Sequence, residues 1–354
     1  YTDATMSYEV GTEIFGDSSD DDEYVYIPDG HDGMFEYDED ADELEGTYLV
    51  VSSVGQSGPV VKRVRALLKL KGLFDKAIVV KDQIVLMPGT YVGGYNSEDP
   101  TDTDVDVDIG TTSTEPDRIS IGPGTVIDAD VFIGVGGDPE VVIGSGGTIN
   151  GQKYALTQEV YFPPVKPPEL TYKGPLLYAK GTTVKLTSED SGQYGAVALA
   201  TAAGNAGVLE IAAGDVVLHI TGGIDLGNSC EIVVADGASL TLYVDGNIAT
   251  KNDAGFANAN ESPSQFRLFA TGDEPQTFDL KAKTDVFGVI YAPEAYVELY
   301  PAGVMRGAIV ADTFVTKSRG TLLYDEQLKK VSLDDIGAHF QVLRWYEDYE
   351  DHED

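Results

Sequence analysis

Beyond Gly72 the chain consists of short apolar segments that each stop at Gly, Pro, Asp or Asn. Residues 77–80, 84–87, 119–121 and 240–244 are examples, and such segments recur about every 8 to 12 residues without amphipathic helical patterns between them. This spacing predicts an all-β fold, because apolar runs this short that are bounded by turn residues form strands rather than helices. Two architectures produce it: an antiparallel sandwich or barrel, and a parallel β-helix.

We favour the parallel β-helix, or solenoid, for residues 73–332. Its strands face an apolar core, and its turns are short and rich in Gly, Asn or Asp. Residues 237–247, which read Gly-Ala-Ser-Leu-Thr-Leu-Tyr-Val-Asp-Gly-Asn, are the clearest example of one coil. A Pro-rich crossing at residues 162–170 interrupts the rhythm, which then resumes. The prediction depends on this rhythm, because no residue-by-residue repeat is visible.

The first part of the chain has a different character. Residues 1–50 hold 17 Asp or Glu and no Lys or Arg, yet apolar and aromatic residues alternate among them. This alternation predicts half-buried antiparallel strands joined by acidic turns, with a hairpin over residues 47–70. We therefore expect an N-terminal antiparallel sheet in residues 1–72, the solenoid body in residues 73–332, and a C-terminal strand with an acidic tail in residues 333–354.

Helical patterns are few. The Ala-rich residues 196–203 could form two turns of helix, and residues 325–331 could form a short helix that caps the end of the solenoid.

Charge and cysteine content exclude several classes of protein. With 60 acidic against 23 basic side chains the net charge is −37, which repels phosphate and argues against a nucleic-acid partner. The single Cys230 excludes an intramolecular disulfide and a cysteine-based zinc site. No apolar run of transmembrane length and no secretion leader is visible, so we expect no membrane anchor within this chain.

One stretch stands out as basic. It comprises Lys62, Arg63, Arg65, Lys69 and Lys71, and these residues could dock onto the acidic first 50 residues of the same chain or of a second copy. An ordinary charged outer face of a strand explains the same pattern.

Calcium is the candidate cofactor. Asp99, Asp102 and Asp104 lie in an acidic loop before a predicted strand, and hard cations take six to eight oxygen ligands of this kind. The loop lacks the spacing and the closing Glu of an EF-hand, and a solvated acidic strand face explains the same residues.

Catalytic patterns are weak. Asp225 and Asp245 are about one coil apart and could stack on one face near Lys251 or Arg267, as a carbohydrate-active β-helix would require. Asp beside Gly is also ordinary turn chemistry. His219 lies between apolar neighbours and reads as a strand histidine whose ring is bonded to a neighbour.

Two glycine-rich segments, residues 134–137 and 144–147, resemble phosphate-binding loops at first sight. No Lys-Ser or Lys-Thr pair and no helix follows either of them, so we interpret them as turns between strands.

Several short motifs of the chain resemble motifs of a known family. Residues 266–270, 286–293, 306–310 and 323–326 resemble the C-terminal β-helix domain of PilX-type proteins of type IV pilus systems. Residues 92–97, 108–113 and 135–139 resemble the start of that domain, residues 343–347 resemble its ending, and residues 1–72 look like the pilin-style sheet that precedes it. The resemblance covers nearly the whole chain, although members usually start with a prepilin-like hydrophobic helix that this chain lacks.

The resemblance implies a secreted or surface-displayed structural protein and no established catalytic residues. We therefore expect an extracellular, non-enzymatic filament subunit or pilus-associated adhesion component. Its expected partners are other copies of itself or pilus components, with surface polysaccharide as a possible ligand. The alternative is a carbohydrate-active β-helix enzyme or a polysaccharide-binding module.

Overall fold

The computed structural model describes residues 7–15, 48–57, 60–99, 101, 105–178, 181–202, 204–281, 286–300, 303–330 and 335–349. The chain forms two compact units. Unit 1 comprises Tyr1–Gly72 together with Lys330–Asp354, and unit 2 comprises Leu73–Lys329.

Unit 1 contains a four-stranded sheet in the order β1-β2-β3-β27. Its strands are β1 (Ser7–Phe15), β2 (Tyr48–Ser57), β3 (Val60–Lys71) and β27 (His339–Tyr349). All three pairings are antiparallel, as the alternation in the sequence predicts, and the β2–β3 pair is the expected hairpin. Leu67 and Leu70 on β3 are buried.

Unit 2 is a parallel β-solenoid, which confirms the predicted fold class. Its first strands are β4 (Ile78–Leu86), β5 (Tyr91–Tyr95), β6 (Asp108–Thr111), β7 (Ile119–Ile121), β8 (Val126–Ile127), β9 (Asp130–Ile133), β10 (Thr148–Ile149) and β11 (Lys153–Ala155). The short helix α1 (Pro139–Val142) lies between β9 and β10, and the Asp138 side chain caps it by accepting from the Glu140 backbone N–H.

The remaining strands follow the Pro-rich crossing. They are β12 (Leu176–Tyr178), β13 (Thr183–Thr187), β14 (Gly192–Tyr194), β15 (Val197–Leu199), β16 (Val208–Ile220), β17 (Ile224–Leu226), β18 (Glu231–Val234), β19 (Ala238–Val244), β20 (Ile248–Thr250), β21 (Gly255–Asn258), β22 (Phe266–Ala270), β23 (Gln276–Lys281), β24 (Val286–Tyr300), β25 (Val304–Thr316) and β26 (Thr321–Asp325). The 3₁₀ turns η1 (Ser188–Asp190) and η2 (Pro263–Gln265) lie between these strands, and η3 (Glu326–Lys329) follows β26.

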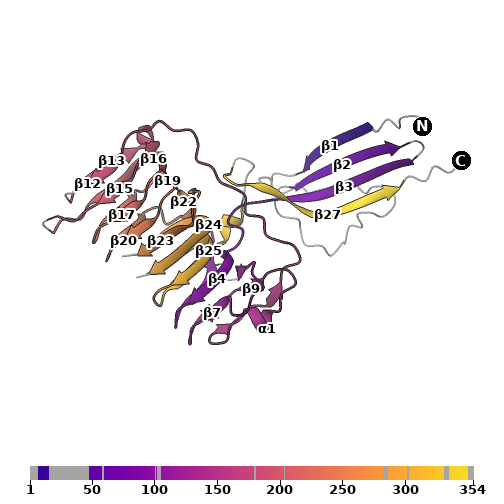
Figure 1. Cartoon of the computed structure of the whole chain (residues 1–354), viewed down its shortest axis with the longest axis horizontal. Helices are drawn as coiled ribbons and strands as arrows, with labels where there is room; N and C mark the ends of the chain where they lie inside the picture. Colours follow the sequence, from indigo (N-terminus) through magenta and orange to yellow (C-terminus); the bar gives the residue numbers. More distant parts are fainter. Residues whose placement is uncertain are drawn as a thin grey trace. The chain divides into compact units, whose positions relative to one another are not determined.

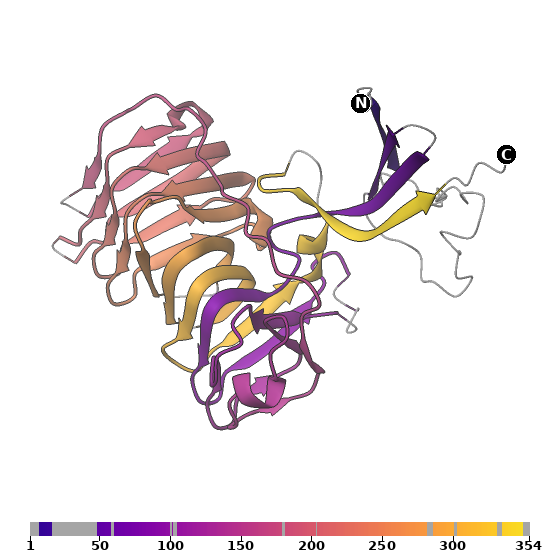
Figure 2. The same ribbon diagram turned by 45° about the vertical axis from the view of Figure 1, so that its right-hand side comes forward.

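The chain enters the solenoid in its middle rather than at one end. β4 to β11 (residues 78–155, the first arm) wind outward from β4. The chain then crosses back through residues 156–175, here called the strap, to β12 at the opposite end (Figures 1 and 2). β12 to β26 (residues 176–325, the second arm) wind back until β25 pairs with β4 and β26 pairs with β5. We call these two pairings the junction.

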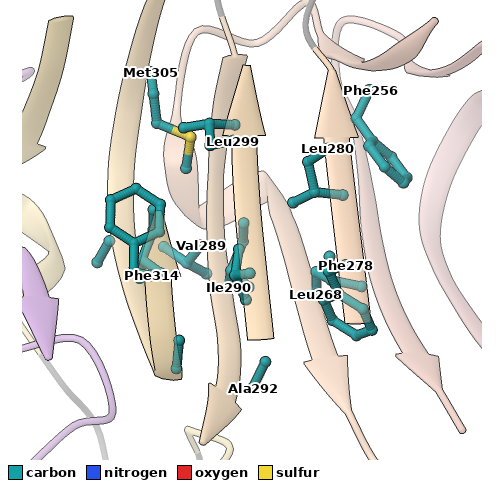
Figure 3. Packing of buried hydrophobic residues seen from close by; sticks show 14 of the residues in the cluster. Phe256, Leu268, Phe278, Leu280, Val289, Ile290, Ala292, Leu299, Met305 and Phe314 are labelled. Atoms are coloured by element: carbon teal, nitrogen blue, oxygen red, sulfur yellow. The ribbon is translucent and has the colours of Figure 1, made fainter. Parts of the chain in front are cut away.

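The register makes one apolar core of the two arms. Parallel pairing aligns ten apolar residues, one per coil, and none of them is more than 7% exposed: Leu176, Val197, Ile224, Ile248, Phe278, Val297, Phe314, Ile84, Ile119 and Ile143. The Phe314–Ile84 step is the junction, so the column continues unbroken from one arm to the other. Figure 3 shows the second-arm side of this core around Phe278, Val289 and Phe314. Full burial of each such side chain stabilises the fold by about 1.5–3 kcal/mol.

Two local predictions were wrong. Residues 196–203 are not helical, because Val197–Leu199 forms β15, which pairs with β12 on one side and β17 on the other. The turn after β26, η3, follows a strand of the junction and does not cap an end of the solenoid. Within the described residues, no helix has the length and hydropathy that a bilayer crossing requires.

Candidate functional site

A second column of side chains runs along the outer face of the solenoid. Its members, aligned by the register, are Gln193, His219, Tyr243, Phe269, Tyr291, Val310, Val79, Gly110, Phe132 and Tyr154. They alternate along their strands with core residues such as Leu218 and Leu242, so they point away from the core. We call this set the outer column.

The apolar members of the outer column are nevertheless buried. Tyr243, Phe269 and Phe132 are at most 3% exposed, and the rings of Tyr243 and Phe269 stack with centroids 5.2 Å apart. Large aromatic side chains on an outer face require a cover, because leaving them in water would forfeit their burial.

The strap contributes to that cover. The Tyr291 hydroxyl donates a hydrogen bond of 2.8 Å to the Pro163 carbonyl, and the Lys81 ammonium lies 5.2 Å from the centroid of the Phe162 ring. Burial, with smaller contributions from Tyr161 and Glu294, raises the pKa of Tyr291 well above its ordinary value, so its hydroxyl remains a donor. Figure 2 shows the strap running along the solenoid between the ends of the two arms.

At the second-arm end, the outer column becomes polar. Nδ1 of His219 lies 3.3 Å from Nε2 of Gln193, and Nε2 of His219 lies 2.9 Å from the Asp245 carboxylate. The Thr271 hydroxyl donates to the other oxygen of Asp245 at 2.7 Å. The prediction of a strand histidine bonded to a neighbour is therefore confirmed, and both ring nitrogens link adjacent coils.

The first-arm end is polar as well. The Tyr154 hydroxyl donates to Oδ1 of Asp108 at 3.0 Å, and the Lys76 ammonium contacts Oδ2 of the same carboxylate. Burial, followed by the charges of Asp108, Asp130 and Asp106, raises the pKa of Tyr154 far above its ordinary value. Polar networks thus close both ends of a buried aromatic column.

The register separates the residues considered for catalysis. Asp225 pairs with Ala198 and Ala249 on the neighbouring coils, so Asp245 is not its partner in the stack. Asp245 is bonded to His219 and Thr271, and Nε of Arg267 donates to the Ser264 carbonyl at 3.0 Å. Asp245 thus links neighbouring coils and Arg267 contacts the preceding turn, while the register keeps Asp225 away from Asp245 in the stack.

The core cavity beside β22 to β25 is too small for a sugar. A cavity of about 20 Å³ lies within the core, lined mainly by apolar side chains that include Phe266, Leu280 and Met305. The last two are visible in Figure 3. Ligand pockets are typically more than ten times larger than this, roughly 300–1,000 Å³.

The calcium site at Asp99, Asp102 and Asp104 stays a prediction. Asp102 and Asp104 lie outside the described residues. Asp99 lies in an exposed turn, where its carboxylate accepts from the backbone N–H and the hydroxyl of Thr101. Within the described residues no group of three or more His, Cys, Asp or Glu is arranged to hold a metal ion.

Two further candidates from the sequence are the glycine-rich segment at residues 134–137 and the basic stretch on β3. The glycine-rich residues 134–137 form a turn closed by the bond from the Gly137 N–H to the Gly134 carbonyl, with Gly136 at a φ of +75°. In the basic stretch, the backbone register places Arg63 opposite Asp348 and Arg65 opposite Tyr346.

Ion pairs near the junction were not predicted. The Arg118 guanidinium lies 2.9 Å from Asp82, and Lys81 contacts Glu294. Burial and the nearby Asp82 charge raise the pKa of Asp312. The pairing of β4 with β7 brings Arg118 to Asp82, and the stacking of β24, β25 and β4 brings Glu294 to Lys81, so no local motif identifies either pair.

Comparison with known proteins gives sparse results. A family model described as a domain of unknown function (DUF7305) matches residues 174–331, the second arm with its flanking residues. No curated protein matches the chain. The solved structure of the competence-associated pilin ComZ from Thermus thermophilus matches with 13% identity over 86% of this chain and 82% of that chain. Its TM-score is 0.24, too low to show a shared fold.

Proposed function

We propose that this chain is an extracellular structural protein, either a filament subunit or a pilus-associated surface or adhesion component, and that it is not an enzyme. In this role the solenoid serves as a stiff body that is displayed or assembled. The pilus association depends on the sequence motifs that resemble PilX-type proteins.

The observation that supports a structural role most directly is how the polar side chains of the outer face are used. His219 and Asp245 hold adjacent coils together, and Asp108 holds Tyr154 and Lys76. A carbohydrate-active enzyme needs acidic and basic groups that converge on a groove with free lone pairs and protons. Here the register directs these groups into bonds between coils.

The net charge of the chain is compatible with the proposed extracellular location. A net charge of −37 keeps an exposed protein soluble, and salt at about 0.1 M screens the repulsion between charges that are more than about 10 Å apart.

Electron microscopy of negatively stained protein from its native source, with and without a calcium chelator, tests the proposal. Regular filaments, or labelling of pili by an antibody against the solenoid, would support it. Filaments that disperse on chelation would place cations, with Asp99, Asp102 and Asp104 as the candidate ligands, at the contacts. Discrete particles and unlabelled pili would contradict it.

The second candidate is a polysaccharide-binding module. Tyr161 and Tyr172 belong to the strap and are 62% and 59% exposed, and exposed tyrosine rings can stack on sugar rings. Binding of the chain to immobilised polysaccharides, lost in a Tyr161→Ala/Tyr172→Ala variant and retained in a Leu177→Ala variant, would favour it.

A further inference from the structure

The turn that joins β10 to β11 contains the one Asn-Gly pair of the chain, Asn150-Gly151. Neither residue belongs to a strand, Asn150 is exposed, and the chain bends at Gly151. β10 and β11 are the last strands of the first arm, and they are two and three residues long. The turn therefore has little regular structure around it to hold its main chain rigid.

The fold requires a glycine at this turn. A Cβ atom at position 151 would lie 2.2 Å from the Ala129 carbonyl oxygen and 2.4 Å from Oδ1 of Asp130, so no larger residue fits there without a shift of the main chain. Because glycine has no side chain, nothing on Gly151 itself hinders an attack by its amide nitrogen on the preceding side chain. Among the described residues, no acceptor is bonded to the Gly151 N–H.

Two carboxylates flank the same turn. Oδ1 of Asp130 accepts a hydrogen bond of 2.7 Å from the Gln152 N–H, so this oxygen lies beside the Gly151 main chain. A carboxylate in this position is a suitable base for a backbone proton. On the neighbouring coil, Oδ1 of Asp128 accepts from Nδ2 of Asn150 at 3.4 Å.

We propose that Asn150 is a site of spontaneous deamidation, in which the Gly151 nitrogen attacks Cγ of Asn150. The N–Cγ bond forms, the Cγ–Nδ2 bond breaks, and the proton of the Gly151 N–H passes through the Asp130 carboxylate or water to Nδ2, which leaves as ammonia. Water then opens the cyclic imide at one of its two carbonyl carbons, which gives aspartate or isoaspartate at position 150. The reaction needs no reactant but water, because the two reacting groups are adjacent in the chain.

The product changes the contact between two coils. Asn150 offers a neutral amide to Asp128, whereas the product offers a second carboxylate, and facing like charges on adjacent strands are mildly destabilising. Isoaspartate also adds a methylene carbon to the main chain before β11, which disturbs the pairing of β11 with β9. Deamidation therefore loosens the end of the first arm, where the strap begins. This inference goes beyond the proposed function and does not depend on it.

Peptide mass mapping of the full chain, sampled during incubation at neutral pH, tests the site. We expect the peptide that contains Asn150 to exchange an NH for an O in mass and to split into aspartate and isoaspartate forms. Asn96 and Asn228 are each followed by serine, so they serve as comparisons within the same sample. We expect deamidation at Asn150 to be severalfold faster than at either of them. An unchanged Asn150, or equal rates at all three positions, would overturn the inference.

Two variants test the assigned chemistry. Asn150→Gln is the matched control, because its longer side chain keeps an amide but forms a cyclic imide much more slowly, and we expect it to remain unmodified. Asp130→Asn is expected to slow the deamidation of Asn150, with circular dichroism to establish that the β content is kept. A rate that Asp130→Asn leaves unchanged would contradict the role of Asp130 in the proton transfer.

Urea unfolding measures the consequence for the fold. Asn150→Asp reproduces one of the two products, and we expect it to cause a small fall in the free energy of unfolding. The fall should be smaller when Asp128→Asn is also present, because the repulsion has then lost one of its two charges. An equal effect of Asn150→Asp in both backgrounds would contradict the charge contact between the coils.

Discussion

Single hydroxyl groups connect segments that are far apart in the chain. Tyr291 reaches Pro163 of the strap, and the buried Tyr324 of β26 donates at 2.8 Å to the Phe74 carbonyl just before β4. Burial raises the pKa of Tyr324 strongly, with smaller contributions from nearby carboxylates, so its hydroxyl stays protonated. Each bond satisfies a backbone carbonyl outside the strand ladders, where an unsatisfied buried group would be costly.

Tyr291→Phe is expected to loosen the strap. The change leaves the Pro163 carbonyl without this donor, which costs roughly 1–3 kcal/mol for a buried group. We expect faster proteolytic cleavage within residues 156–175 and a small fall in the free energy of unfolding. Tyr172→Phe, at an exposed position on the same strap, is the control. Equal cleavage rates in the two variants would show that the Tyr291 bond does not hold the strap.

The Glu298–Lys317 pair predicts a pH dependence. Burial alone would raise the pKa of Glu298, but bonds from Lys317, Tyr296 and Tyr300 outweigh it and lower that pKa below 4.5. The unfolded chain therefore takes up this proton more readily than the folded chain. The stabilisation is fully present above pH 4.5 and is lost as the pH falls through the folded-state pKa.

Urea unfolding at pH values on either side of 4.5 measures this effect. Glu298→Gln is expected to reduce the loss of stability on acidification. Glu294→Gln should change it little, because Glu294 is highly exposed and surface pairs contribute little. An acid sensitivity that is the same in Glu298→Gln and the unaltered chain would refute the assignment.

At the scale of strands, the sequence predicted which segments form strands better than it predicted which strands pair with each other. The segment at residues 237–247 contains β19, as its alternation and flanking glycines indicate. The pairing of Val310 with Val79 could not be predicted, because parallel ladders between distant segments leave no local pattern. At residues 196–203 the helix propensity of alanine was overridden by ladder bonds on both sides of β15.

The same distinction explains the outer face. His219 was recognisable as a bonded strand residue, but its partners Gln193 and Asp245 are each 26 residues away along the chain. The Pro-rich crossing was visible in the sequence as an interruption. The contact of this crossing with Tyr291, 128 residues further along the chain, was not visible in the sequence, because the contact depends on the order in which the coils stack.

Phe314→Ala tests the junction between β25 and β4. Phe314 is fully buried and pairs with Ile84, so truncation leaves a cavity where the two arms meet and is expected to cost about 3–5 kcal/mol. Chemical denaturation gives the free energy of unfolding. Leu177→Ala, at a position 57% exposed, should change it by only about 0.5 kcal/mol. A comparable small effect of Phe314→Ala would mean that the junction is not a packed part of the core.

At the scale of the whole chain, strand pairing at the junction, rather than the covalent link through the strap, holds the two arms of the solenoid together. The strap is the covalent link between the two arms, whereas the junction and the β3–β27 pair join segments on its two sides without it. A break in the strap leaves those ladders in place.

Cleavage at a specific protease site inserted between Lys166 and Pro167 tests this closure. The cleaved chain is expected to sediment as one particle of unchanged mass and to separate into two fragments only in denaturant. The uncleaved insertion variant is the control for effects of the insertion itself. Separation of the fragments in native buffer would show that the ladders do not hold the arms together.

The position of the junction also sets the order in which the protein can be completed. A chain that emerges from its N-terminus leaves one side of β4 and one side of β3 without a partner until residues 304–316 and 339–349 have followed. Native closure therefore waits until β27 has been made, and contacts this distant in sequence form slowly. During that interval the exposed edges are open to other chains, so the cell that makes this protein must keep unfinished copies apart.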